Sequence, residues 1–274
     1  LALASALAVA ALIAPWQWRR GEPSAGQVRA PGLRVAVLDV GQGDAILLQP
    51  PHAPALLVDG GPPGAGLPGQ LEDHGVDRLA AAVLTHDQSD HSGGVAELLG
   101  RLPIGRLLYA RLGRPLRAAA EAARVEPIRI AAGDTVRSGS LRLEVIWPPP
   151  ALLAAPLDSG DPNQQALVMV ARWRGFSMLL SGDAEAEAVP IDPGPVDVLK
   201  VAHHGSEDGG LPALLDRLRP RLALISAGDG NPFGHPTATT LADLAAAGVP
   251  VLRTDRDGTI EIGVGRRSFT VSSH

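Results

Sequence analysis

The chain has 274 residues, of which 45% are hydrophobic, a formal net charge of −5 and no cysteine. This composition excludes an intrinsically disordered chain and leaves room for one large domain or two small ones. The lack of cysteine excludes disulfides, thiolate metal sites and cysteine nucleophiles, so any metal must be bound by histidine and carboxylate side chains, and the acidic balance excludes a broad basic surface for nucleic acid.

The first segment, residues 1–14, is an uninterrupted run of small and apolar residues, followed over 15–20 by two tryptophans and two arginines. A bilayer requires about 20 apolar residues, and a signal peptide begins with a basic segment, which is missing here. We therefore expect 1–20 to be the end of a truncated transmembrane helix with its tryptophans at the interface; the alternative is a buried soluble helix. Residues 21–32 are rich in Gly and Pro and predict a linker to a globular domain over 33–274.

Short apolar runs bounded by Gly, Pro and Asp recur after the linker and predict strands, whereas longer stretches between some of them predict helices. Three strands precede the first helix, and later strands pair with helices, which indicates an α/β (α+β) class with two sheets and helices outside them. The segment 148–161 predicts a surface loop that joins the two halves. The predicted strands are Leu33–Leu38, Ala45–Gln49, Ala55–Val58, Ala80–Thr85, Arg106–Tyr109, Leu141–Trp147, Gln165–Ala171, Phe176–Ser181, Val196–Val201, Leu222–Ser226, Val251–Arg253, Thr259–Val264 and Ser268–Val271, and the predicted helices are Gly94–Leu102, Pro115–Arg124, Leu211–Leu218 and Thr237–Ala247.

The most informative motif ends the strand predicted over 80–85 and reads Thr-His-Asp-Gln-Ser-Asp-His. It places His86, Asp90 and His91 at a strand end, just before a helix. Imidazole and carboxylate ligands without thiolate suit Zn, Mn or Fe and leave room for water. The alternative for Asp90 is a helix N-cap that binds no metal.

Three further motifs follow predicted strands. Asp183 ends a Ser-Gly-Asp turn, His203 and His204 lie within Leu-Lys-Val-Ala-His-His-Gly-Ser, and His235 lies in the loop Asn-Pro-Phe-Gly-His-Pro. Each motif alone is compatible with an ordinary turn or a buried histidine. Together they all lie at or after the carboxyl ends of strands, where ligand sites of layered α/β proteins are commonly built, and we expect them to converge.

The loop between the first two predicted strands, residues 39–44, contributes Asp44 as a candidate catalytic residue. Its glycines permit a tight turn that brings backbone N–H groups close to an anion, although the Gly-Lys-Ser/Thr ending of a P-loop is absent. The alternative is a hairpin turn in which Asp44 binds its own backbone. Asp59, before two glycines, is expected to be a structural turn carboxylate, and the histidines expected at the surface are His52, His74 and His274.

In this order, the motifs resemble those of the metallo-β-lactamase-fold domain of the ComEC-type competence family, the channels that bring transforming DNA across the inner membrane. The resemblance covers residue 33 to the C-terminus, and the apolar start also fits, because in that family this domain follows the last membrane helix. It implies a four-layer αββα sandwich of the metallo-β-lactamase fold, with one or two divalent ions (Zn or Mn) between the sheet edges. The implied metal ligands are His86, Asp90, His91, Asp183, which would bridge two ions, and one of His203 and His204.

The sequence departs from the family pattern at the first metal position. Gln88 stands where the fold usually has a histidine, and a neutral Asn-Gln-Gln stretch at 163–165 stands where another metal histidine is usual. We therefore expect the first position to bind more weakly than the second and to favour Mn or Mg over Zn. Glu207 and Asp208, beside the histidine pair, would repel DNA, whereas four arginines could contact phosphates: Arg172, Arg174, Arg253 and Arg256.

The resemblance implies a nuclease that degrades the non-transported DNA strand by metal-assisted hydrolysis of phosphodiesters. The metal would lower the pKa of a water towards about 7, Asp90 would orient that water, and His235 would be a ligand or protonate the leaving oxygen. Two alternatives are a phosphodiesterase or esterase for a small molecule or wall component, and a non-catalytic scaffold of the channel. The expected partners are single-stranded DNA and the membrane part of the same longer chain, and the expected location is the extracytoplasmic side of the cell membrane.

Overall fold

The computed structural model describes residues 32–154 and 161–274, except residue 267. The expected membrane-helix end over 1–20 and nearly all of the expected linker over 21–32 therefore lie outside the described residues. Within the described parts of the chain, no helix is long and apolar enough to cross a membrane.

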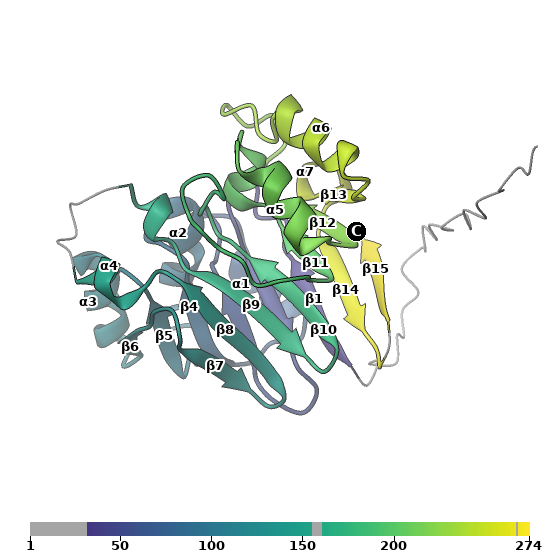
Figure 1. The fold of residues 1–274 in the computed structure, drawn as a ribbon. Helices are drawn as coiled ribbons and strands as arrows, with labels where there is room; N and C mark the ends of the chain where they lie inside the picture. Colours follow the sequence, from purple (N-terminus) through teal and green to yellow (C-terminus); the bar gives the residue numbers. More distant parts are fainter. Residues whose placement is uncertain (1–31, 155–160, 267) are drawn as a thin grey trace, which may run out of the picture.

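Two β-sheets lie face to face, with helices on their outer sides (Figure 1). The first sheet has the strand order β15-β14-β1-β2-β3-β4-β5-β6 and the second has the order β13-β12-β11-β10-β9-β8-β7. The strands of the first sheet are β1 (Leu33–Val37), β2 (Ile46–Gln49), β3 (Ala55–Val58), β4 (Leu79–Leu84), β5 (Arg106–Tyr109), β6 (Glu126–Arg129), β14 (Ile260–Val264) and β15 (Phe269–Ser273). Those of the second are β7 (Thr135–Ser138), β8 (Leu141–Trp147), β9 (Val168–Trp173), β10 (Phe176–Leu180), β11 (Val198–Lys200), β12 (Leu222–Ile225) and β13 (Val251–Arg253).

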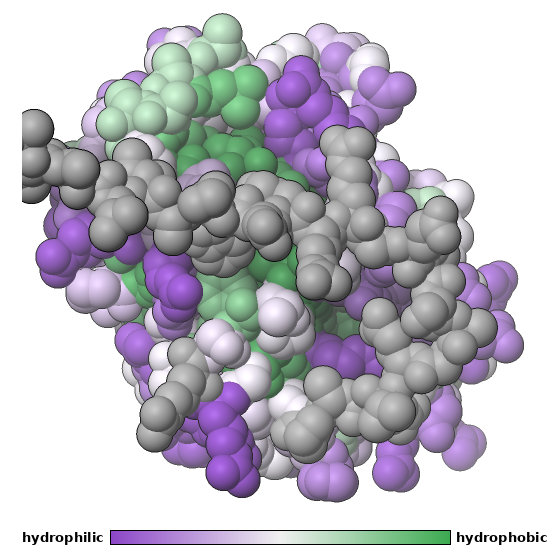
Figure 2. Space-filling model, turned by 90° about the vertical axis from the view of Figure 1, so that its right-hand side faces the viewer, coloured by the Kyte–Doolittle hydropathy of each residue, from purple (hydrophilic) through white to green (hydrophobic). Residues whose placement is uncertain are grey.

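Helices cover the outer face of each sheet, so the predicted four-layer αββα sandwich is confirmed. The helices over the first sheet are α1 (Leu67–Asp73), α2 (Ser89–Leu98) and α3 (Arg114–Ala122), and those over the second are α5 (Leu211–Leu218) and α6 (Ala238–Ala246). Seen from the side of β14 and β15, hydrophobic residues are visible at the centre and at the upper left, and hydrophilic residues lie mainly along the right and lower edges (Figure 2). The short helices are α4 (Pro150–Leu153), α7 (Thr254–Asp257), η1 (Asn163–Gln165) and η2 (Ala202–Gly205).

Successive side chains of each strand fill two different layers, because they point to opposite faces of the sheet. In β1, Val35 packs between the sheets, whereas Ala36 packs under the helices of the first sheet. In β10, Met178 and Leu180 pack between the sheets, whereas Leu179 packs under the helices of the second sheet. Strands that are buried on both faces form continuous apolar runs, which is why these elements were predictable as runs.

Strand direction brings the candidate residues to one end of the molecule. In the first sheet, β1, β3 and β4 run the same way, because β2 is antiparallel to both β1 and β3 and β3 is parallel to β4. In the second sheet, β10, β11, β12 and β13 are all parallel. The carboxyl ends of both groups lie at a common edge, where their loops meet.

The predicted elements all have counterparts in the structure; β3, β5, β8, β13 and α5 have the predicted bounds, and the others have shifted ends. The helix expected from Gly94 begins at Ser89 with Gln88 as its N-cap, so the alternative of Asp90 as the N-cap is wrong. Helix α1 was not predicted because its glycine and proline are typical of loops, and β6 and β7 were not predicted because their side chains are mostly exposed or half-buried. The expected loop over 148–161 contains α4 in its described part.

Candidate metal centre

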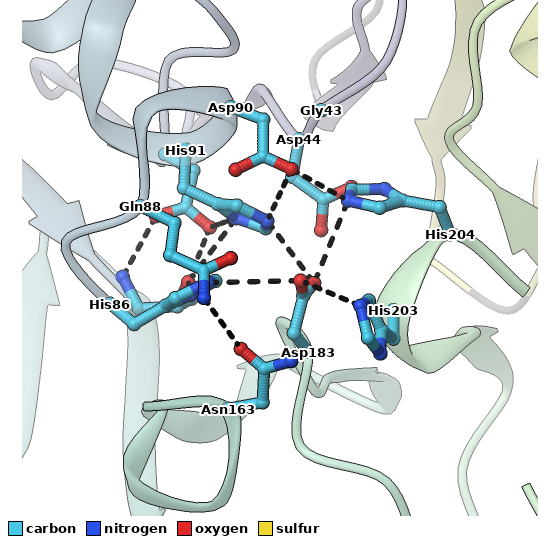
Figure 3. A network of polar contacts seen from close by, with 12 residues as sticks. Gly43, Asp44, His86, Gln88, Asp90, His91, Asn163, Asp183, His203 and His204 are labelled. Carbon is cyan, nitrogen blue, oxygen red and sulfur yellow. Dashed lines mark hydrogen bonds and ion pairs between the residues drawn. The ribbon is translucent and has the colours of Figure 1, made fainter. Parts of the chain in front are cut away.

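The predicted metal ligands converge where the carboxyl edges of the two sheets meet (Figure 3). Three of them come from the first sheet, directly after β4 and in the first turn of α2. The other three come from the second sheet, after β10 and in η2 after β11. The structure thus brings together His86, Asp90, His91, Asp183, His203 and His204 from segments that are far apart in the sequence.

The carboxylate of Asp183 lies at the centre of this cluster. Its Oδ1 lies 3.1 Å from Nε2 of His91 and 3.8 Å from Nε2 of His204. Oδ2 of Asp90 lies 3.4 Å from Nε2 of His204 and 4.0 Å from Nε2 of His91. One donor atom from each of these four residues lies within 4.8 Å of the other three, so a single ion could contact all four.

The other oxygen of Asp183 faces a less complete set of donors. Its Oδ2 lies 3.7 Å from Nε2 of His86 and 3.8 Å from Nε2 of His203. The amides of Gln88 and Asn163 also lie on this side, where Nε2 of Gln88 donates a hydrogen bond of 3.3 Å to Oδ1 of Asn163 (Figure 3). Among the described residues, the Oδ2 side forms no compact group of three charged or imidazole donors.

Each of the four histidines has a partner for its Nδ1 atom, which leaves Nε2 facing Asp183. Metal-binding histidines typically use the second ring nitrogen in this way, because a carboxylate or carbonyl partner orients the ring. The partners of Nδ1 are Asp59 Oδ2 for His91 (2.8 Å), Glu185 Oε1 for His203 (2.8 Å), Thr85 Oγ1 for His86 (3.1 Å) and the carbonyl oxygen of Ser226 for His204 (2.9 Å).

The adjacent pair His203 and His204 points inward because of its backbone. Both residues have left-handed conformations, with φ of 48° and 54°. This conformation costs of order 1–3 kcal/mol per non-glycine residue, and residues strained in this way cluster at functional sites. Consecutive residues of a strand would point to opposite faces, whereas here both Nε2 atoms face Asp183. The two rings divide its oxygens: buried His204 is close to Oδ1, and His203, which is 30% exposed, is close to Oδ2.

Buried atoms of this cluster lack hydrogen-bond partners within the described part of the chain. They are Nε2 of His86, His91 and His204 and both carboxylate oxygens of Asp183; the close contact of His91 with Asp183 does not have hydrogen-bond geometry. An unpaired buried polar atom costs about 1–3 kcal/mol, so such atoms are normally paired. Imidazole nitrogens and carboxylate oxygens without sulfur match Zn, Mn or Fe. The residues therefore fit a divalent metal ion.

Electrostatics also favours a cation at this position. Burial opposes the charged form of His91, but Asp183 and Asp59 outweigh it and raise the pKa of His91 well above its usual value. Burial likewise opposes charge on His204, yet the neighbouring carboxylates of Asp44 and Asp90 raise its pKa to about 9. Burial would raise the pKa of Asp183, but the surrounding histidines hold it well below its usual value. A metal ion would displace these protons as it binds.

Asp44, the candidate catalytic residue of the first loop, lies behind His204. Its Oδ2 accepts a hydrogen bond of 2.7 Å from Nζ of Lys200, and its Oδ1 lies 3.5 Å from Nδ1 of His204. Asp44 and Lys200 are 1% and 0% exposed, so they form a buried ion pair between the two sheets. Gly43 allows the loop that carries Asp44 to lie close to the backbone of Asp90: its φ is 145°, and a Cβ there would lie 2.2 Å from the backbone oxygen of Asp90. The alternative of Asp44 bound to its own backbone is wrong.

His235 lies on the outer side of the cluster, with its ring centroid 5.6 Å from that of His203. The Asn231 side chain donates to the carbonyl oxygen of His235 and accepts from its backbone N–H. Burial and the neighbouring histidines His203 and His204 lower the pKa of His235. Its ring is therefore mainly neutral at pH 7, so proton donation by His235 would require protonation beforehand.

Four residues around the cluster were missed or underestimated from the sequence. Lys200 is the only lysine of the chain and lies in an apolar strand, a signal for a buried ion pair. Asp59, expected only as a turn carboxylate, is buried and accepts hydrogen bonds from N and Oγ1 of Thr85, in addition to contacting His91. Nothing in the local sequence distinguishes Thr85 or Glu185 from ordinary polar residues.

Several charged side chains that were expected to lie near DNA instead form hydrogen bonds, ion pairs or ring contacts within the protein. Asp208 is buried and accepts hydrogen bonds from three backbone N–H groups, so it does not face the cluster. Arg172 pairs with a glutamate and Arg174 lies over the Trp173 ring, both at the end of β9 that points away from the cluster. Arg253 is paired with an aspartate. His74, expected at the surface, is half-buried and contacts a glutamate.

Comparisons with known proteins agree with the motifs. The sequence profile described as the Metallo-beta-lactamase superfamily matches residues 38–229. The chain is 31% identical to ComE operon protein 3 of Bacillus subtilis, over 87% of this chain and 34% of that protein. It is 30% identical to Competence protein ComA of Neisseria gonorrhoeae (85% and 32%) and 30% identical to Recombination protein 2 of Haemophilus influenzae (77% and 26%). The chain thus spans about a third or less of these relatives, and the predicted resemblance to competence proteins is confirmed.

Solved structures share the architecture. CmlA, a diiron beta-hydroxylase from Streptomyces venezuelae, matches with a TM-score of 0.58 and 13% identity over 89% of this chain and 55% of that one. The metallo-beta-lactamase fold protein YhfI from Bacillus subtilis matches with 0.55 and 11% (80% and 95%). Igni18, a metallo hydrolase from Ignicoccus hospitalis, matches with 0.53 and 14% (85% and 100%). At these identities the likeness shows the fold alone.

Proposed function

The chain belongs to the metallo-β-lactamase superfamily, and on this premise we propose that it hydrolyses phosphodiester bonds of single-stranded DNA with the help of divalent metal ions. The observation that carries the proposal is the Asp183 carboxylate, whose two unpartnered oxygens each lie close to two histidine Nε2 atoms. A carboxylate in this position can bridge two ions, and two-metal sites recur in phosphatases and nucleases. The similarity to competence proteins supports DNA as the substrate.

The chain offers unequal ligand sets for the two ions. One ion would be held by Asp90, His91, Oδ1 of Asp183 and His204. The other would be held by His86 and Oδ2 of Asp183, with His203 and two neutral amides nearby, and we expect it to bind more weakly and to be Mn or Mg rather than Zn. Such ions act as Lewis acids, lowering the pKa of water and neutralising charge on phosphate oxygens.

The protein groups around the ions would orient the reactants. Asp90 is 29% exposed, so its carboxylate can bind an ion and also accept a hydrogen bond from the attacking water. His235 lies beyond His203 on the outer side, where it can contact the leaving oxygen. Asp44 and Lys200 do not reach this side; we assign them the positioning of His204.

We further propose that the domain acts beside a DNA-uptake channel, as part of a longer chain at the extracytoplasmic side of the cell membrane. The similarity to Competence protein ComA and ComE operon protein 3 supports this placement. Protease accessibility of the domain in intact cells with a permeabilised outer layer tests it: protection of the domain until the membrane is broken would contradict the placement.

Asp183→Asn and His86→Ala test the nuclease proposal. We expect both variants to lose Mn-dependent digestion of single-stranded DNA while their circular dichroism spectra stay unchanged, and we expect the matched control His52→Ala, an exposed histidine outside the cluster, to keep full activity. Full activity of either cluster variant would contradict the assignment. A chain that binds no divalent ion at stoichiometry would favour the scaffold alternative, and hydrolysis of small phosphodiesters but not DNA would favour the small-molecule alternative.

A further inference from the structure

Phe233 is the one large hydrophobic side chain that is exposed among the described residues, with 65% of its surface accessible. It lies in the loop between β12 and α6, which also carries His235 (Figure 1). Single exposed hydrophobic residues are common on protein surfaces, so exposure alone indicates no function. Its position relative to the metal centre is what distinguishes it.

A series of aromatic rings leads from Phe233 to the metal centre. The centroid of its ring lies 6.1 Å from that of His235, which in turn lies 5.6 Å from that of His203. Nε2 of His203 lies 3.8 Å from Oδ2 of Asp183. The exposed ring is therefore two ring-to-ring steps from a histidine that faces the central carboxylate, on the side that His203 leaves partly open to solvent.

The loop that presents Phe233 is held in place by its own hydrogen bonds. Nδ2 of Asn231 donates to the carbonyl oxygens of Gly228 (2.9 Å) and His235 (2.6 Å), and Oδ1 of Asn231 accepts from the backbone N–H of His235 (3.1 Å). The backbone N–H of Gly228 donates to Oε1 of Gln42, which ties the loop to the first sheet. A ring presented by such a loop loses little conformational freedom when a ligand stacks on it.

We propose that Phe233 is the stacking platform for a nucleobase of a single strand whose phosphate lies at the metal centre; this inference rests on the proposed function. Aromatic side chains stack the bases of single strands independently of their sequence. Stacking needs no positive charge, which matters here because the chain carries a net charge of −5 and exposes Glu207 beside the histidine pair and Asp229 in the same loop. The metal ions would bind the phosphate, and Phe233 would bind the base.

The test compares two single-stranded substrates of equal length on the 274-residue chain loaded with Mn: oligothymidylate and an oligomer of abasic deoxyribose phosphates. We expect Phe233→Ala to raise the KM for oligothymidylate about 5- to 100-fold, to the value for the abasic oligomer, and to leave kcat and the KM for the abasic oligomer unchanged. Phe233→Trp should restore the low KM. Asp229→Asn, in the same loop, is the matched control and should not raise either KM.

The inference and the proposed function fail separately. Unchanged KM values for Phe233→Ala, in a wild-type chain that digests DNA, would overturn the stacking platform and leave the nuclease intact. If the wild-type chain does not digest DNA, the test is the Kd for a hydrolysis-resistant phosphorothioate oligothymidylate. Weaker binding by Phe233→Ala than by the wild type would support the stacking platform without the nuclease. Equal binding by the two proteins would overturn the stacking platform.

Discussion

The donor groups on the two sides of the Asp183 carboxylate differ in charge and in how closely they are grouped. Oδ1 faces His91 and His204, with the carboxylate of Asp90 between them, and these donors lie close enough for one ion. Oδ2 faces His86 and His203, and the remaining space is lined by two neutral amides. Because anionic and imidazole donors bind divalent ions more strongly than amides, we expect the Oδ1 side to bind an ion more strongly than the Oδ2 side. The superfamily fold thus does not by itself determine how many ions stay bound.

The largest expected effect separates these two sides directly. His204→Ala removes a donor from the closed Oδ1 group, so it should weaken binding of the first equivalent of Zn or Mn by more than the roughly 10- to 100-fold that loss of an outer partner costs. His86→Ala removes a donor only from the Oδ2 side and should leave the first equivalent unchanged while the second is lost. Isothermal titration with each metal measures both equivalents. Equal weakening of the first equivalent in both variants would contradict the comparison.

The next effect concerns the ion pair behind the Oδ1 side. Lys200→Met leaves Asp44 charged and unpaired in the interior, so it should lower the free energy of unfolding by about 3–5 kcal/mol and weaken the first metal equivalent by about 10- to 100-fold. Adding Asp44→Leu should recover most of the stability, because an apolar pair replaces the ion pair, but not the metal affinity. Chemical denaturation and metal titration check the two quantities. If the double variant recovered both the stability and the metal affinity, the ion pair would have no role in positioning His204.

A smaller effect is expected from a substitution that adds a metal ligand on the Oδ2 side. Gln88→His places an imidazole beside Oδ2 of Asp183 and should tighten the second Zn equivalent by about tenfold, or about 1.4 kcal/mol. The matched control is Gln164→His, an exposed position next to the amide of Asn163. Metal content after gel filtration in a limiting Zn buffer distinguishes the two variants. A Gln88→His chain that retains no more Zn than the control would contradict the assignment of this space to a second ion.

The smallest effect lies away from both sides, at the pair of His74 and Glu261. The contact of 3.2 Å between Nε2 of His74 and Oε1 of Glu261 raises the pKa of His74 above 6.5 and lowers the pKa of Glu261 below 4.5. The histidine contribution to stability is complete below 6.5 and is lost as the pH rises through the raised pKa; the glutamate contribution is complete above 4.5 and is lost as the pH falls through the lowered pKa.

His74→Gln should therefore destabilise the protein between pH 4.5 and pH 6.5. The loss should be less than about 1 kcal/mol, because solvent partly screens the pair, and it should vanish near pH 9. Denaturation at about pH 5.5 and about pH 9 measures the difference. Both metal equivalents should bind as in the wild type. A loss of stability that is equal at the two pH values would mean that the histidine ring contributes by packing instead of by charge.

Local patterns in the sequence were sufficient for the two-sheet α/β class, for most strands and helices and for the ligand types, whereas the four-layer sandwich was implied by the family resemblance. Strands that are buried on both faces appear as apolar runs, and His, Asp and Gly motifs directly after such runs mark the carboxyl edges of the sheets. Without cysteine, thiolate ligands were excluded, which left imidazole, carboxylate and amide groups. Each run and the motif after it lie within a few residues of one another, so they can be recognised from the sequence without knowledge of the tertiary contacts.

The tertiary structure decided how these ligands are shared. Which histidine of the pair lies near which oxygen of Asp183 depends on two left-handed residues and on the acceptors that Glu185 and Ser226 supply to Nδ1. The pairing of Asp44 with Lys200 joins residues 156 positions apart. Such contacts depend on the packing of two sheets against each other, and the geometry of that packing is a property of the whole chain, whereas motifs are properties of short segments.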